Sequence, residues 1–264
     1  MGLVTVITSG KGGAGKSTVS VGLGCTLAKN GKRVLLIDGD AGLRSLDAML
    51  GVDKELVFDI SDIVNGNCEP IKAIYSCEEY TGLNNLFLLP APALEKHTIH
   101  PDLMKQLVPI LSRYYDHVII DCPAGIGKGF ISAVAAADRA LVISTPDPIC
   151  IRDSDKVRQL LEERGIRQQR LVINRFSFES FRKMQHYQDI DTIIDETGIR
   201  LIAVLPDDIH LQTNPAKAVV NHSRSPGTMA LQRLAAPIRK IIMIFRFKFI
   251  RKRRGNREHC FNRT

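Results

Sequence analysis

The chain has 264 residues, which is enough to bury one substantial core, and a single large α/β domain matches this length. No run of about 18 uncharged apolar residues occurs, so the sequence predicts no membrane-spanning helix. The six cysteines form no C-x-x-C pair, which favours reduced thiols in a cytosolic protein over a disulfide framework or a zinc site. No basic segment precedes the first apolar run, and we therefore expect no signal peptide.

The net charge of +8 originates at the end of the chain. Residues 239–264 contain ten of the 36 Lys and Arg residues and a single acid, Glu258. The rest of the chain is therefore close to neutral. A localised basic segment predicts an anionic surface as partner, either membrane lipid or nucleic acid.

Apolar runs alternate with helical patterns along most of the chain. The expected strands are Leu3–Thr8, Arg33–Asp38, Leu86–Pro90, His117–Asp121, Ala140–Thr145, Leu171–Asn174 and Leu201–Leu205. The expected helices are Lys16–Lys29, Ile60–Asn65, Pro101–Tyr114, Phe130–Ala136, Arg152–Glu163, Asp191–Glu196 and Thr228–Ala236. This alternation predicts an α/β fold with a mostly parallel, twisted sheet of about seven to eight strands and helices on both faces. We expect one domain over residues 1–237 and a separate tail over residues 238–264.

The first apolar run leads into a glycine-rich loop, G-K-G-G-A-G-K-S-T, from Gly10 to Thr18. This loop fits the pattern G-x-x-x-x-G-K-[ST] and precedes a helical pattern, which is the context of a phosphate-binding loop. Glycines let backbone N–H groups curl around a polyphosphate, and the helix N-terminus attracts the same anion. Lys16 is placed to reach the β- and γ-phosphates, and the Ser17 hydroxyl to bind Mg²⁺. The sequence thus predicts a three-layer P-loop NTPase fold.

Two later strands end in aspartates that should lie at the edge of the sheet near this loop. One strand ends I-D-G-D at Asp38 and Asp40, and another ends at Asp121 within D-C-P-A-G-I. In open α/β sheets, ligands bind beyond the carboxyl ends of the strands. Asp121 is a candidate for holding the metal's water shell, and Asp40 for orienting an attacking water. Residues 125–127 are expected to move with the γ-phosphate.

The phosphate loop resembles the deviant Walker A motif of the ParA/MinD family of ATPases, which carries an extra lysine, here Lys11. The similarity continues at residues 38–47 (D-G-D-A-G-L-R-S-L-D), 121–126 (D-C-P-A-G-I), 151–157 (I-R-D-S-D-K-V), 172–175 (V-I-N-R) and 205–208 (L-P-D-D). These blocks span most of residues 3–238 and are most similar to the cell-division branch of the family.

The resemblance implies slow, partner-stimulated hydrolysis of ATP with Mg²⁺ in an ATP-sandwiched homodimer, where Lys11 reaches the nucleotide of the partner subunit. The catalytic residues it implies are Lys11, Lys16 and Asp40, and the metal-site residues are Ser17, Asp40 and Asp121. The nucleotide-binding residues it implies are Gly10, Lys11, Gly12, Gly13, Ala14, Gly15, Lys16, Ser17 and Thr18, with Asn174 and Pro206 flanking the adenine.

For the cell-division branch, the resemblance implies recruitment of a division inhibitor, regulator proteins of the Min system as partners, and residence on the inner face of the cytoplasmic membrane. Partition ATPases that bind nucleoid DNA, flagellar-number relatives and scaffolds with negligible turnover are the alternatives. G-L-R at residues 42–44 disfavours a partition ATPase, and Arg44 disfavours a flagellar-number protein. Cys122 lies in no cluster-binding motif, and we expect it to be a small buried residue.

The tail after Pro237 has an amphipathic pattern. On a helix, its apolar residues form one stripe at Ile238, Ile241, Ile242, Phe245 and Phe249. Such a helix would lie at a membrane interface with its bases towards anionic headgroups, so we expect a membrane-targeting segment and consider nucleic acid the less favoured partner. Alternation within residues 245–249 leaves a strand open as the other interpretation.

Overall fold

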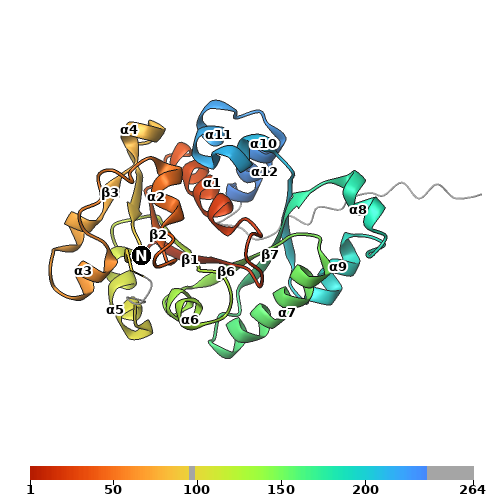
Figure 1. The fold of residues 1–264 in the computed structure, drawn as a ribbon, viewed down its shortest axis with the longest axis horizontal. Coiled ribbons are helices and arrows are strands. Elements are labelled where there is room, and N and C mark those ends of the chain that lie inside the picture. The colour runs from red at the N-terminus through yellow and green to blue at the C-terminus, as the bar shows by residue number, and fades with distance from the viewer. Residues whose placement is uncertain (95–98, 237–264) are drawn as a thin grey trace, which may run out of the picture.

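The computed structural model describes residues 1–94 and 99–236. Figure 1 shows three layers, in which helices cover both faces of a central sheet. The strands are β1 (Leu3–Thr8), β2 (Val34–Asp38), β3 (Tyr75–Ser76), β4 (Leu86–Leu89), β5 (His117–Asp121), β6 (Arg139–Ser144), β7 (Gln169–Phe176) and β8 (Leu201–Pro206). Their order is β3-β4-β2-β5-β1-β6-β7-β8, and all pairs are parallel except β3 with β4. The predicted fold class is therefore confirmed.

The helices lie between the strands and, for the last three, after β8. They are α1 (Lys16–Lys29), α2 (Ser45–Leu50), α3 (Ile60–Val64), the 3₁₀ turn η1 (Pro70–Ala73), α4 (Glu78–Thr81), α5 (Pro101–Leu111), α6 (Lys128–Val134), α7 (Pro148–Glu163), α8 (Phe178–Met184), α9 (Ile190–Thr197), α10 (Ile209–Thr213), α11 (Pro215–Asn221) and α12 (Pro226–Ala235). In Figure 1, α1 and α10–α12 lie on one side of the sheet, and α5, α6, α7 and α9 lie on the other.

Two hydrophobic clusters fill the space between the sheet and its two helix layers. Side chains alternate between them along the central strands: in β2, Leu35 and Ile37 enter one cluster, and Val34 and Leu36 enter the other. The second cluster includes α1, where Gly24 approaches the sheet so closely that a Cβ there would lie 2.8 Å from a methyl of Leu36. The continuously apolar strands of the sequence thus reflect burial on both faces.

Two helices begin earlier than the sequence predicts because a proline occupies their first turn. Helix α7 was expected from Arg152 but starts at Pro148, and Asp147 caps it by accepting a hydrogen bond from the Cys150 N–H. Helix α12 likewise starts at Pro226 behind the cap residue Ser225. Proline is compatible with the first helical position because its missing N–H has no partner there in any case.

Seven short elements are absent from the predicted set, although the equally short α3, α6 and β4 are in it. The absent elements are β3, α2, η1, α4, α8, α10 and α11, and each has between two and seven residues. Segments of this length often contain too few positions for a hydrophobic period to be recognised.

The predicted tail stripe at Ile238, Ile241, Ile242, Phe245 and Phe249 lies outside the described residues. The expected boundary between residues 237 and 238 falls there too and stays a prediction. In residues 1–94 and 99–236, no helix is both long enough and apolar enough to cross a bilayer.

Leu36 offers a test of this packing. The side chain is fully buried, so Leu36→Ala should lower the free energy of unfolding by ~2–5 kcal/mol through lost burial and a residual cavity. Leu43 is 76% exposed, and Leu43→Ala should change it by less than about 0.5 kcal/mol. Urea unfolding followed by circular dichroism measures both values. Equal effects of the two substitutions would contradict the described core.

Candidate functional site

The glycine-rich loop joins β1 to α1 at the carboxyl edge of the sheet, and its shape needs glycine at defined positions. Gly13 and Gly15 have φ angles of 78° and 95°, which side-chain-bearing residues rarely adopt. Gly10 lies against α7, where an added Cβ would come within 2.5 Å of the Asp153 carbonyl carbon. A loop of this kind exposes backbone N–H groups to an anion at the N-terminus of α1.

Lys16, in the first turn of α1, extends back beneath the loop. The residue is only 8% exposed, and its Nζ donates a hydrogen bond to Ser9 Oγ over 3.3 Å. Ser9 Oγ in turn donates to the Lys11 carbonyl oxygen at 2.8 Å. The ammonium group of Lys16 therefore lies inside the loop that the sequence predicts to bind phosphate.

Asp121 ends β5 and accepts two short hydrogen bonds from α1. Ser17 Oγ donates to one carboxylate oxygen over 2.6 Å, and Ser20 Oγ donates to the other over 2.7 Å. Burial raises the pKa of Asp121 to about 6 despite these two donors and the nearby charge of Lys16. The predicted metal-side pair, Ser17 and Asp121, is thus brought into direct contact.

Asp38 ends β2 and lies opposite Asp121 in the parallel register. Burial, followed by the charge of Asp121, raises the pKa of Asp38 to about 7. Its two oxygens accept hydrogen bonds from the backbone N–H groups of Asp40, at 2.9 Å, and Leu46, at 3.2 Å. Asp38 therefore shapes the segment that carries Asp40, a role that the sequence does not assign although its position at the end of an apolar strand is visible there.

The carboxylates at this edge fit a divalent cation. Asp40 is half-buried, and its negative charge contributes to the raised pKa values of Asp38 and Asp121, behind the larger effect of burial. In the described part of the chain, no three His, Cys, Asp or Glu side chains form a group that could hold a metal by itself. The donor set of Ser17 and Asp121 instead suits Mg²⁺, which keeps water and phosphate oxygens in its shell.

Asn174 supports the phosphate loop from β7. Its buried side-chain Nδ2 donates to the Ala14 carbonyl oxygen over 2.9 Å, and a Cβ on Gly15 would lie 2.2 Å from the same nitrogen. Pro206 ends β8 and is half-buried. The predicted position of Asn174 and Pro206 beside an adenine stays a prediction, because the observed contact of Asn174 is with the loop.

Lys11 points away from the interior of the loop and is paired with α7. Its side chain is 47% exposed, and its Nζ lies 3.4 Å from Asp147 Oδ1. The hydrogen bond from the Cys150 N–H, and then Lys11, hold the pKa of Asp147 below its usual range. An exposed pair of this kind contributes only ~0–1 kcal/mol, so Lys11 can exchange this partner for another at little cost.

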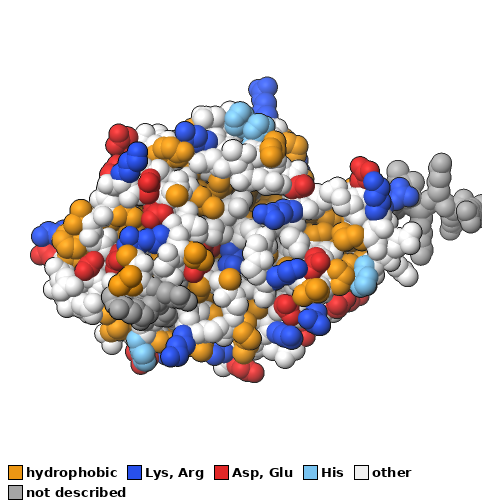
Figure 2. Space-filling model, in the orientation of Figure 1, with side chains coloured by type: hydrophobic (Ala, Val, Ile, Leu, Met, Phe, Trp, Pro, Cys, Tyr) orange, Lys and Arg blue, Asp and Glu red, His pale blue; other side chains and the backbone are white. Residues whose placement is uncertain are grey.

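Large apolar side chains that are at least half exposed lie along the carboxyl edge of the sheet. One follows almost every parallel strand at its carboxyl end: Leu43, Leu94, Ile126, Ile149, Phe178 and Ile209. On the face drawn in Figure 2, apolar side chains lie in small groups between charged ones. This apolar rim lies on the same edge of the sheet as Lys11.

Cys122 directly follows Asp121 and is 1% exposed, which confirms the expectation that it is a small buried residue. Burial raises the pKa of its thiol to about 12, so the thiol stays protonated and unreactive at neutral pH.

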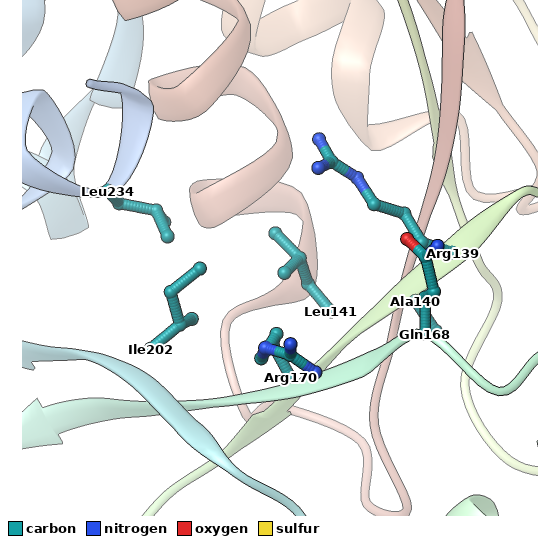
Figure 3. A pocket seen from close by; sticks show the side chains of 7 residues that line it. All are labelled: Arg139, Ala140, Leu141, Gln168, Arg170, Ile202 and Leu234. Atoms are coloured by element: carbon teal, nitrogen blue, oxygen red, sulfur yellow. The ribbon is translucent and has the colours of Figure 1, made fainter. Parts of the chain in front are cut away.

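A separate hollow lies towards the opposite edge of the sheet, where β6 and β7 begin. Figure 3 shows its lining: Arg139, Ala140, Leu141, Gln168, Arg170, Ile202 and Leu234. Its lining contains neither a carboxylate nor a glycine loop, so its chemistry does not suit a nucleotide with Mg²⁺.

Comparisons with known proteins agree with this arrangement. The family model described as ParA, NUBPL iron-transfer P-loop NTPase, matches residues 2–240. The septum site-determining protein MinD of Thermotoga maritima is 41% identical over 244 residues, covering 90% of this chain and 89% of that protein. The MinC:MinD cell division protein complex of Aquifex aeolicus superposes with a TM-score of 0.78 at 35% identity, over 88% of this chain and 94% of that one. MinD of Pyrococcus horikoshii, complexed with Mg-ADP, superposes with a TM-score of 0.78 at 29% identity, over 89% of this chain and 95% of that one.

The raised pKa of Asp38 predicts a pH-dependent cost in stability. Between its ordinary pKa and about 7, the folded chain keeps a proton that the unfolded chain has lost, so folding becomes less favourable as the pH rises through this window. Asp38→Asn should therefore stabilise the nucleotide-free protein by ~1–3 kcal/mol more at pH 8 than at pH 5, relative to wild type. Urea unfolding at both pH values measures this difference, with exposed Asp191→Asn as the control. A difference that does not depend on pH would contradict the raised pKa of Asp38, which burial and then the charge of Asp121 cause.

Proposed function

The chain belongs to the ParA/MinD family of P-loop ATPases, and on this basis we propose that it is a septum site-determining ATPase that dimerises with ATP, binds the membrane and recruits a division inhibitor. The observation that carries the proposal is the combination, at one sheet edge, of the exposed Lys11 with the buried group of Lys16, Ser17 and Asp121. In this proposal, Lys11 contacts the nucleotide of a neighbouring subunit. The buried group binds the nucleotide and metal of its own subunit.

The nucleotide is ATP and the metal is Mg²⁺, as the P-loop family and the Mg-ADP complex of the Pyrococcus relative indicate. In the proposed complex, backbone N–H groups of residues 10–18 surround the phosphates, and Lys16 exchanges Ser9 for the β- and γ-phosphate oxygens. Ser17 and Asp121 orient the metal and its water shell. When bound, Mg²⁺ neutralises charge on the phosphates and polarises the γ-phosphate.

Asp40 is the proposed residue for orienting the hydrolytic water. Its backbone is fixed from both sides, because its N–H donates to Asp38 and its carbonyl accepts a hydrogen bond from the Arg44 N–H over 3.3 Å. The water attacks the γ-phosphorus, the bond to the bridging oxygen of ADP breaks, and the water proton is released with phosphate. Lys16 and the partner subunit's Lys11 then stabilise the negative charge on the transferring group.

Dimerisation is supported by two features of the same edge. Lys11 is held only by an exposed ion pair with Asp147, so a second nucleotide with its higher negative charge can compete for the lysine. The apolar rim defined above would be covered when two such edges meet, which favours association. Dimerisation and hydrolysis are then coupled, because each site receives one lysine from the other subunit.

The membrane contact is assigned to the tail beyond residue 237, where the apolar stripe and ten basic residues lie. One short amphipathic helix is a weak and reversible anchor, and a dimer carries two of them. The second tail binds at a high effective concentration, so ATP-driven dimerisation would switch the protein onto the membrane.

We further infer that the partner is a division inhibitor related to the MinC of the Aquifex complex, because this chain covers 94% of the chain it matches in that structure at 35% identity. A partition-type function with the tail on DNA remains the rival, and the same assays separate the two.

The role of Asp40 is tested by Asp40→Ala. Turnover of ATP should fall at least about 100-fold because the water loses its orienting carboxylate, while the affinity for ATP stays within about threefold. Phosphate release measures the turnover, and a fluorescent ATP analogue measures the binding. Unchanged turnover would refute this role, and loss of binding would place Asp40 in nucleotide recognition instead.

The membrane switch is tested by sedimentation with vesicles that contain anionic phospholipid. Wild-type protein should sediment at least about fivefold more with ATP than with ADP, because two linked tails bind the membrane more tightly than one. Lys11→Ala should lose the ATP dependence together with the dimer seen by light scattering, and truncation after Ala236 should lose binding in both states. Equal sedimentation with both nucleotides would contradict the switch. ATP-stimulated, salt-sensitive binding to DNA without lipid binding would establish the rival function.

A further inference from the structure

The segment that carries Asp40 is tied to a neighbouring loop by a group of contacts that nucleotide binding does not require. The Gly42 N–H donates to the Pro92 carbonyl oxygen over 3.0 Å, and Arg44 Nε donates to the Ala91 carbonyl oxygen over 2.8 Å. Both acceptors lie in the loop that follows β4. The loop after β2 is thus attached to the loop after the neighbouring strand β4.

Asp59 completes this attachment from the N-terminus of α3. One of its oxygens accepts a hydrogen bond from Arg44 over 2.9 Å and another from the Ala93 N–H over 3.1 Å. Its other oxygen caps α3 by accepting from the Ser61 N–H. A single carboxylate therefore holds the loop after β2, the loop after β4 and the start of a helix in one arrangement.

The environment of this ion pair distinguishes it from an ordinary surface pair. The Arg44 and Asp59 side chains are 24% and 10% exposed, whereas Lys183 and Glu179 of α8 are 74% and 77% exposed. Arg44 also has a φ angle of 45°, and among the described residues only Arg175 and Gln185 share a positive φ without being glycine. Such a backbone persists only where surrounding contacts hold it, and strained residues of this kind cluster at functional sites.

The guanidinium geometry explains why an arginine occupies this position. Nε and one terminal nitrogen point to two different acceptors, the Ala91 carbonyl and the Asp59 carboxylate. A lysine has one ammonium group and cannot reach both acceptors in a fixed orientation. The Arg44 backbone N–H meanwhile donates to the Asp40 carbonyl oxygen, so a shift of Arg44 is passed directly to Asp40.

We propose that Arg44 and Asp59 are a positioning pair for ATP hydrolysis, which fixes the Asp40 loop against the loop after β4 and so sets the place of the attacking water. This inference rests on the function proposed above. In the described part of the chain, neither side chain has a hydrogen bond or ion pair with the phosphate loop. The pair therefore acts on turnover through Asp40 and leaves ATP binding to the loop itself.

The test compares Arg44→Ala, Asp59→Asn and the double variant with wild type. Asparagine is also a good helix cap, so Asp59→Asn removes the charge while α3 keeps its cap. Each single variant should lower kcat roughly tenfold through misplacement of the water, with the affinity for ATP within about twofold of wild type. The kcat of the double variant should not fall below that of the more impaired single variant, because both changes break the same pair. Glu179→Gln removes an exposed ion pair of α8 and should leave kcat unchanged.

Amide hydrogen exchange gives a second reading that does not depend on activity. The Gly42 N–H should exchange at least about tenfold faster in Arg44→Ala and Asp59→Asn than in wild type, and at the wild-type rate in Glu179→Gln. The proposal would be overturned if Arg44→Ala had the same turnover and the same Gly42 exchange rate as wild type. It would also be overturned if kcat and the affinity for ATP fell by the same factor. If the wild-type protein had no ATPase activity, the proposed function would be refuted instead. If the Gly42 N–H in both variants then also exchanged at the wild-type rate, the positioning role of the pair would be refuted too.

Discussion

The parallel pairing of β2 with β5 forces Asp38 and Asp121 to lie opposite each other at the buried end of the sheet. Gly39 permits this closeness, because a Cβ there would lie 2.6 Å from the Asp121 carbonyl oxygen. Two carboxylates in such a place can both be ionised only if a cation balances them, and otherwise they keep protons. The serine hydroxyls of α1 and the ammonium group of Lys16 surround this negative charge. The fold itself therefore favours a cation at this edge, even in the absence of nucleotide.

Arg44, Lys11 and Lys16 at this edge differ in the contacts that hold them, and the difference matches their proposed tasks. Arg44 makes a partly buried ion pair with a carboxylate and two further hydrogen bonds, which suits a structural role. Lys11 makes an exposed, easily broken pair, which suits a residue that must change partners. Lys16 contacts a hydroxyl group beneath the glycine loop, where its charge is available to a phosphate. These basic residues carry the same charge, but they suit different tasks because they differ in burial and in how strongly their contacts hold them.

The sequence predicts the parallel sheet and the phosphate loop well, because buried strands and the G-K-S spacing are local patterns. It places Asp40 and Asp121 at one edge through the general rule for parallel strands, and the structure brings them there. The pairing of Asp38 with Asp121 depends on which strands are neighbours, and that order is not written in any single segment. The contacts of Arg44 with Ala91 and Asp59 are missed for the same reason. Most of the short helices are missed because four to seven residues show little periodicity, although α3 and α6 are predicted.

Asn174 lies 160 positions after Ala14 in the chain, yet its amide holds the Ala14 carbonyl and occupies the space beside Gly15. The curvature of the phosphate loop is therefore maintained by a strand that belongs to the other half of the molecule. A fragment that contained every residue of the glycine-rich motif, together with β1 and α1, would lack this support. The motif is accordingly no transferable module in this protein, and anion binding there should appear only once β7 has joined the sheet during folding.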